Sequence, residues 1–185
     1  APAAAAPAPV TAPCPTPAEA ALIAAAYAKS PQPMPFAAAP ALKLPEVVVA
    51  SGLPGELGRA VAGSHFRAVW DSLRAWPSAT IMIRKGGNIF EVGSRVPGGE
   101  PSKRSSYFNL DHDFPISGHL RPDLLTAIEG VRLASGEGFV RGVFFYDGSG
   151  ESVFGVFLQA EGAEPDAAAI AAFDQANGAD PNQEQ

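Results

Sequence analysis

The spacing of apolar residues changes at Pro77, from the period of a helix to the period of strands. Within residues 65–76, the bulky side chains fall at i, i+3, i+4 and i+7, so they share one face of a predicted amphipathic helix. These side chains are Phe66, Val69, Trp70 and Leu73. Beyond Pro77, apolar and polar residues alternate, and the Gly86-Gly87 turn between 80–85 and 88–93 predicts a β-hairpin.

Shorter periodic segments complete the pattern. Helices are predicted at 18–29, 44–54 and 165–176, and a further helical turn or two at 55–62. Besides the hairpin, strands are predicted at 105–110, 116–120, 126–134, 138–146 and 151–159, whereas 96–102 is predicted as a loop. Short helices, then about seven strands, then one closing helix indicate an α+β fold with a large antiparallel sheet.

The composition divides the chain into tails and a compact domain. Ala and Pro dominate residues 1–40, a composition that removes backbone donors and offers little bulky surface to bury. We therefore expect a tail and linker over 1–40, with one short helix at 18–29 and a Pro-rich linker at 31–40. Residues 41–176 are expected to form a single domain, and 177–185 a disordered C-terminal tail.

Charge, cysteine content and missing motifs exclude several classes of function. The net charge of −6 argues against nucleic-acid binding, which needs a basic face. The single cysteine, Cys14, allows no intrachain disulfide and fits a reducing compartment. The sequence contains no run of about 18 apolar residues, which is the length needed to span a bilayer. Nucleotide-binding loops and paired-cysteine motifs are also missing from the sequence.

The most informative stretch is Ser105–Pro122, which reads SSYFNLDHDFPISGHLRP. Its YFNL motif begins at Tyr107 and its SGH triplet ends at His119. Together with FRAVWD at 66–71, GVFFYD at 142–147 and VFL at 156–158, these motifs resemble the HutX/ChuX-type haem carriers of bacterial haem-uptake systems. The resemblance covers roughly residues 42–159.

This resemblance implies a cytoplasmic carrier that binds haem b after import and passes it to haem-using or haem-degrading proteins. It implies a homodimer that resembles the two-repeat HemS-type fold, with a haem importer or a haem-degrading protein as partner, and no enzymatic activity. Two alternatives stay open. One is a haem-degrading enzyme related to the HemS/ChuS-type proteins, which contain two copies of this unit, and the other is a non-haem interaction module on the same fold.

His119 is the candidate iron ligand. Haem needs apolar walls, cations for its two propionates and an axial ligand, and a neutral imidazole meets the last requirement. A neighbouring carbonyl or carboxylate would accept the other ring proton, and Gly118 would let a planar ligand approach the backbone. The structural alternative is a half-buried histidine that hydrogen-bonds to the backbone.

Arg84 is a candidate for a second contact with haem. Strand alternation places it on the face opposite Ile81 and Ile83, and its fork of donors suits a propionate or a group on the distal side. In the resemblance, some family members carry a second histidine at this position, so bis-histidine coordination within one chain is not expected here. The alternative is an exposed strand arginine.

The loop before the YFNL motif supplies two more cations. Lys103 and Arg104 are candidates for propionate contacts from the loop edge, with a solvated pair of loop residues as the alternative. Tyr107 is also a candidate haem contact, but a phenol binds iron only when deprotonated, so packing or a hydrogen bond is the favoured role. His112 is interpreted as part of a polar turn, and His65 is assigned no role.

Overall fold

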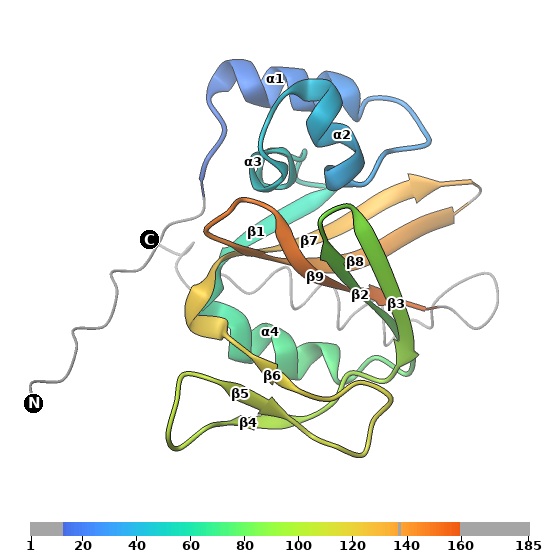
Figure 1. Cartoon of the computed structure of the whole chain (residues 1–185). Coiled ribbons are helices and arrows are strands. Elements are labelled where there is room, and N and C mark those ends of the chain that lie inside the picture. Colours follow the sequence, from blue (N-terminus) through green and yellow to red (C-terminus); the bar gives the residue numbers. More distant parts are fainter. Residues whose placement is uncertain (1–12, 137, 160–185) are drawn as a thin grey trace, which may run out of the picture.

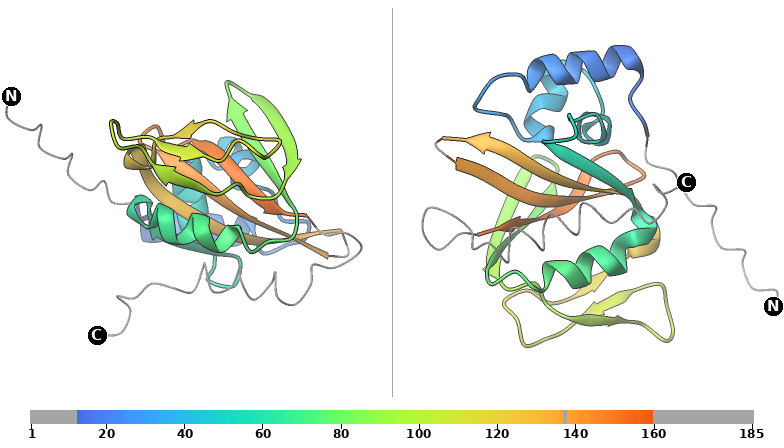
Figure 2. Two further views of the ribbon diagram at one scale, coloured as in Figure 1. Left: turned by 90° about the horizontal axis from the view of Figure 1, so that it is seen from below. Right: turned by 180° about the vertical axis from the view of Figure 1, so that it is seen from behind.

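A computed structural model describes residues 13–136 and 138–159 and contains three layers (Figure 1). A six-stranded antiparallel sheet lies in the middle, in the order β1-β7-β8-β9-β2-β3. Three N-terminal helices cover one face of this main sheet. One helix and a small three-stranded sheet, in the order β4-β5-β6, lie on its other face (Figure 2). The predicted α+β fold with a large antiparallel sheet is therefore confirmed.

The elements have the following bounds. The helices are α1 (Pro17–Ala26), α2 (Pro35–Leu42), α3 (Glu46–Ser51) and α4 (Phe66–Leu73), with 3-10 turns η1 (Gly63–His65) and η2 (Pro122–Leu124). The strands of the main sheet are β1 (Gly58–Ala62), β2 (Ala79–Lys85), β3 (Asn88–Ser94), β7 (Leu125–Ser135), β8 (Gly138–Asp147) and β9 (Ser152–Leu158). The small sheet comprises β4 (Gly99–Pro101), β5 (Phe108–Leu110) and β6 (His119–Leu120).

The N-terminal helical layer begins with a complete capping box. The Thr16 side chain accepts a hydrogen bond from the Glu19 N–H at 3.3 Å, and the Glu19 carboxylate accepts one from the Thr16 N–H at 2.7 Å. These two bonds satisfy donors that the first turn of a helix would otherwise leave unpaired. They also hold the pKa of Glu19 below its usual value. The predicted helix at 18–29 is thus present as α1, although it ends three residues earlier.

The predicted linker at 31–40 is wrong, because α2 begins inside it. Pro35 occupies the first turn of α2, where a missing N–H costs nothing, and Ala38 and Ala39 pack against the main sheet. Pro40 lies inside the helix. Burial of this apolar face stabilises α2 in spite of Pro40, a tertiary effect that local composition does not reveal.

Strand alternation gives the main sheet two separate apolar cores. Met82, Val131 and Phe144 point toward α1–α3, whereas Ile81 and Val143 point toward α4. The core on the α4 side is rich in aromatic rings, with Phe145 and Phe154 stacked at 4.4 Å. The predicted amphipathic face of α4 is buried there through Phe66, Val69, Trp70 and Leu73.

Two predicted local structures are wrong, and both corrections are strands. The segment 55–62, predicted as helical turns, contains β1, in which Gly58 pairs with Val131 of β7. The segment 96–102, predicted as a loop, contains β4, in which Gly99 pairs with Leu110 of β5. Both strands are short, and each forms because it pairs with a strand from another part of the chain. The described residues therefore contain nine strands, where about seven were expected.

Parts of the predicted domain organisation fall outside the described residues. These parts are the N-terminal end of the 1–40 tail, the closing helix at 165–176 and the tail at 177–185. No helix of the described part of the chain is long and apolar enough to cross a membrane.

Candidate functional site

The small sheet turns His119 outward. In the β5–β6 pairing, Phe108 lies opposite Leu120 and Asn109 lies opposite His119. Phe108 is buried in the core on the α4 side, so by alternation Asn109 and His119 occupy the outer face of the small sheet. The His119 side chain is exposed. The alternative role, a half-buried histidine that hydrogen-bonds to the backbone, is therefore wrong.

Among the described residues, one hydrogen bond orients the His119 ring. Its Nδ1 lies 2.8 Å from the Oδ1 atom of Asn109, which can only accept a hydrogen bond. The Nδ1 atom therefore donates, so a neutral ring carries its proton on Nδ1 and has its lone pair on Nε2. Histidine binds metals through such an exposed nitrogen. A hydrogen bond from the other ring nitrogen, as here from Nδ1, fixes the ring and strengthens the metal bond.

Gly118 has a conformation that favours glycine. Its φ is +138°, and no atom outside its chain neighbours lies within 4 Å of the position that a Cβ would occupy. Its carbonyl accepts a hydrogen bond from the Leu110 N–H at 2.9 Å, which continues the β5–β6 ladder. The glycine is thus required by the backbone itself, and the space in front of it is open.

Tyr107 lies beside His119 on the same face. The two ring centroids are 5.7 Å apart, and the Arg121 guanidinium lies 5.5 Å from the Tyr107 ring. Arg121 also binds both carboxylate oxygens of Asp123, at 2.7 Å each. This pair lowers the pKa of Asp123 and raises the pKa of Arg121. Arg121 is therefore partly neutralised by its own neighbour.

Lys103 and Arg104 lie at the Tyr107 end of the small sheet. Their loop is closed by a hydrogen bond from the Ser102 N–H to the Tyr107 carbonyl, at 2.7 Å, and the Arg104 N–H donates to Ser102 Oγ at 3.2 Å. Both side chains are exposed. In the described part of the chain, no ion pair involves either of them.

Tyr107 also lines a cavity of about 610 Å³. It lies between the start of α4, the 102–107 loop and η2, and its volume falls within the roughly 300–1,000 Å³ range usual for ligand sites. Its lining consists of Gly63, Ser64, Phe66, Arg67, Pro101, Ser105, Ser106, Tyr107, Phe108, Pro122 and Asp123. Tyr107 thus links the cavity to the face that carries His119.

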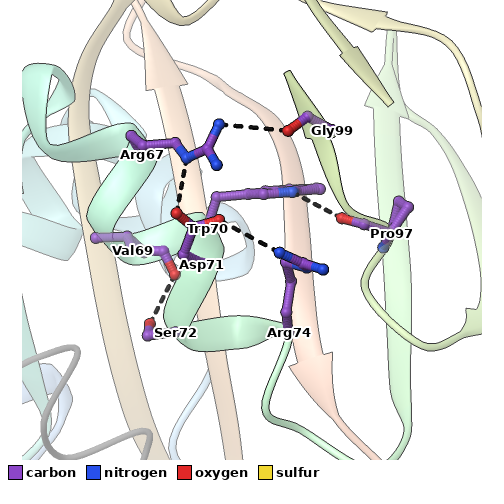
Figure 3. Close-up of polar contacts among 8 residues, drawn as sticks. All are labelled: Arg67, Val69, Trp70, Asp71, Ser72, Arg74, Pro97 and Gly99. Carbon is purple, nitrogen blue, oxygen red and sulfur yellow. Dashed lines mark hydrogen bonds and ion pairs between the residues drawn. The ribbon is translucent and has the colours of Figure 1, made fainter. Parts of the chain in front are cut away.

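Contacts of α4 fix the cationic wall of this cavity (Figure 3). The Arg67 guanidinium donates to Asp71 at 2.7 Å and to the Gly99 carbonyl at 3.3 Å. One turn further along α4, the Trp70 indole N–H donates to the Pro97 carbonyl at 2.9 Å. These bonds tie α4 to the chain that enters β4, so the position of Arg67 is set by both elements.

The structure does not bring Arg84 to His119. Its guanidinium lies on the other side of the main sheet, where it donates to Glu46 at 2.6 Å and to Ser152 at 2.8 Å and packs over Phe36 at 4.3 Å. The side chain is 20% exposed, so it is not an exposed strand arginine either. Alternation placed Arg84 on the correct face, but α2 and α3 cover that face.

Sequence reasoning missed Asn109 and Arg67. Asn109 stands in the YFNL motif, two residues after Tyr107, and its role appears only once the β5–β6 register places it opposite His119. The i, i+4 spacing of Arg67 and Asp71 indicates an ion pair on a helix, but the neighbouring sequence does not indicate that Arg67 lines a cavity. Within residues 13–136 and 138–159, no group of three His, Cys, Asp or Glu residues could hold a metal ion. His119 therefore offers one nitrogen to a metal.

Comparisons with known proteins agree with this architecture. A family model described as haem utilisation ChuX/HutX matches residues 59–176. No curated protein sequence matches the chain. The structure of the heme binding protein ChuX is similar, with a TM-score of 0.74 and 21% identity over 86% of this chain and 97% of ChuX. A protein from Erwinia carotovora gives a TM-score of 0.75 and 24% identity over 88% and 98% of the two chains.

A longer protein contains a similar unit. The heme degrading enzyme ChuS of Escherichia coli O157:H7 gives a TM-score of 0.68 and 15% identity over 84% of this chain. The match covers 47% of ChuS, so the chain spans about half the length of that enzyme. At these identities, the likeness to solved structures establishes the fold.

Proposed function

Because the chain belongs to the ChuX/HutX haem-utilisation family, we propose that it binds haem b and carries it between proteins, with Nε2 of His119 as the axial ligand of the iron. The observation that carries this proposal is the 2.8 Å hydrogen bond from His119 Nδ1 to Asn109, which leaves an exposed Nε2 lone pair. Haem iron already has four ring nitrogens, so one protein nitrogen is enough to anchor it.

The surroundings of His119 suit the remainder of the haem molecule. Tyr107 presents an aromatic surface, 43% exposed, next to the imidazole. We assign Tyr107 to packing against the haem ring or to a hydrogen bond from its phenol. Lys103 and Arg104 have no carboxylate partner among the described residues, and they can approach propionates from the end of the small sheet. Arg84 is not included, because Glu46 occupies its guanidinium.

Transport favours a site from which haem can leave. His119 lies on an outer face, so the ligand it holds stays accessible to a partner, and release on a useful timescale is what a carrier requires. We propose a cytoplasmic homodimer without enzymatic activity that receives haem from an importer and delivers it to haem-using or haem-degrading proteins. The alternative is haem degradation, because the similar unit in ChuS belongs to an enzyme described as heme degrading.

A haemin titration tests the proposal. Purified protein is titrated with haemin while the Soret band is followed, with His119→Ala beside the wild type and His112→Ala, another exposed histidine, as the matched control. We expect saturable binding that His119→Ala weakens or changes in spectral form and His112→Ala leaves intact. Asn109→Ala should weaken binding by roughly tenfold, because it removes the acceptor that orients the ligand.

The outcomes separate the parts of the proposal. If the wild type shows no saturable change of the Soret band, haem binding is refuted. If the spectrum of His119→Ala is the same as that of the wild type, only the assignment of His119 as the ligand is refuted. Loss of the Soret band on addition of reductant and oxygen, with release of a ring-opened product, would favour the degrading enzyme over the carrier. Light scattering after size exclusion, with and without haem, tests the homodimer.

A further inference from the structure

An arginine lies on the same outer face of the small sheet as His119. Arg121 follows directly after β6, two residues beyond His119, and its guanidinium lies 5.5 Å from the centre of the Tyr107 ring. The Tyr107 ring in turn lies 5.7 Å from the imidazole of His119. Tyr107 therefore connects the candidate iron ligand to a guanidinium, a group that binds carboxylates through two parallel hydrogen bonds.

A carboxylate of the chain itself binds this guanidinium. Nε and Nη2 of Arg121 donate to the two carboxylate oxygens of Asp123, at 2.7 Å each. This bidentate arrangement is the one that the carboxylate of a ligand would make with an arginine. The Arg121 side chain is 38% exposed and the Asp123 side chain 34%, so solvent screens the pair and a second carboxylate can reach the guanidinium.

The surroundings of Asp123 favour its ionised form. The Arg121 guanidinium holds the pKa of Asp123 below its usual value, and a hydrogen bond from the Ser106 side chain adds to this effect. Asp123 therefore keeps a donor when the guanidinium turns to another carboxylate. Asp123, Ser106 and Tyr107 also line the cavity of about 610 Å³, so the ion pair lies where this cavity meets the face that carries His119.

We propose that Arg121 binds a haem propionate and that Asp123 competes with this propionate for the same guanidinium, so that the pair sets how readily haem is released. This role rests on the proposed function and defines how the same site binds and releases its ligand. A carboxylate two residues away in the chain is present at a high effective concentration, so it returns to Arg121 when the propionate leaves. Such a competitor suits a carrier, because it shortens the lifetime of the complex and preserves the contact that recognises the ligand.

Haemin titrations of two single variants and of their combination test this competition. Arg121→Gln should weaken haemin binding about tenfold, because it removes the charge-assisted hydrogen bonds to the propionate. Asp123→Asn should tighten binding about threefold, because the guanidinium no longer has a competing carboxylate. In the Arg121→Gln background, Asp123→Asn should have no effect, since Asp123 acts only through that guanidinium. The gain in affinity is decisive, because a folding defect would cause a loss.

Matched controls separate this contact from a general effect of charge. Arg95→Gln and Asp113→Asn remove the same charges from other exposed positions and should leave haemin affinity unchanged. Haemin with both propionates methylated should bind equally to the wild type, Arg121→Gln and Asp123→Asn.

The outcomes distinguish this proposal from the proposed function. Wild-type haemin affinity in Arg121→Gln would overturn the propionate contact. An equal gain from Asp123→Asn with and without Arg121, or no gain at all, would overturn the competition. In these cases saturable binding that depends on His119 would leave the proposed function standing, whereas failure of the wild type to bind haemin would refute both.

Discussion

Glu129 should make the stability of this protein fall as the pH rises through neutrality. Its side chain is fully buried on β7, on the face covered by α3, and Tyr146 and Glu46 lie on the same side. One carboxyl oxygen lies 2.7 Å from Ser51 Oγ, and the other has no hydrogen-bond partner within residues 13–136 and 138–159. Burial raises the pKa of Glu129 from 4.5 to about 8.

The hydrogen bonds of Ser51 support a protonated Glu129. Ser51 Oγ lies 2.7 Å from the Val47 carbonyl, which can only accept, and 2.7 Å from Glu129 Oε1. A hydroxyl has one proton, so both contacts are hydrogen bonds when Ser51 donates to Val47 and the protonated carboxyl of Glu129 donates to Ser51. The neutral acid therefore fits this geometry, and the carboxylate does not.

The sign and size of the effect follow from the two pKa values. Between about pH 4.5 and about pH 8, the folded protein keeps a proton on Glu129 that the unfolded chain has released, so stability falls as the pH rises. This contribution is complete below the unfolded value and is lost as the pH rises through the folded value. From about pH 5.5 to about pH 7.5 the expected loss is about 2.5 kcal/mol, because one pKa unit corresponds to about 1.4 kcal/mol.

Urea unfolding at a series of pH values measures this loss. Trp70 and Trp76 are both buried and report unfolding by fluorescence. Glu129→Gln should flatten the pH dependence by about 2.5 kcal/mol over this interval, whereas Glu91→Gln on an exposed strand position should leave it as in the wild type. Parallel pH profiles for wild type and Glu129→Gln would refute the reasoning.

Three further substitutions test individual contacts. Arg84→Met leaves the buried Glu46 carboxylate unpaired and should cost about 2 kcal/mol in urea unfolding; a loss below about 0.5 kcal/mol would contradict the ion pair. Gly118→Ala should cost about 1 kcal/mol at its φ of +138°, while Gly148→Ala, also in open space but without a positive φ, should cost less; equal costs would argue against strain. Trp70→Phe removes a 2.9 Å hydrogen bond and core volume, so a loss of about 2 kcal/mol is expected, and an unchanged midpoint would rule this out.

The elements with a strong local period were predictable. The i, i+3, i+4, i+7 pattern predicted α4, and the Gly86-Gly87 turn predicted the β2–β3 hairpin. Strand alternation also placed Arg84 on the correct face of the sheet, opposite Ile81. The short elements were not predictable. The strand β4 has three residues, and α2 contains a proline, so both depend on surfaces supplied by distant parts of the chain.

The candidate site was predictable as a set of residues and not as a geometry. His119 and Tyr107 were found from their motifs, and the structure places them on one face. The partner of His119 follows from the β5–β6 register, which depends on the path of the connection between these strands. The separation of Arg84 from this face depends on Glu46, a residue of α3 with no local relation to β2.

The main sheet divides the polar groups of this protein by function. On the α1–α3 side, Arg84, Glu46 and Ser51 hydrogen-bond to other residues of the protein, and burial raises the pKa of Glu129 to about 8. On the small-sheet side, the Nε2 atom of His119 is exposed with only its other nitrogen engaged. Substitutions on the α1–α3 side should therefore change the free energy of unfolding and preserve the haem affinity of the folded protein. Substitutions of His119 should lower the haem affinity and preserve the free energy of unfolding. Measuring both quantities on the same variants would reveal any coupling across the sheet.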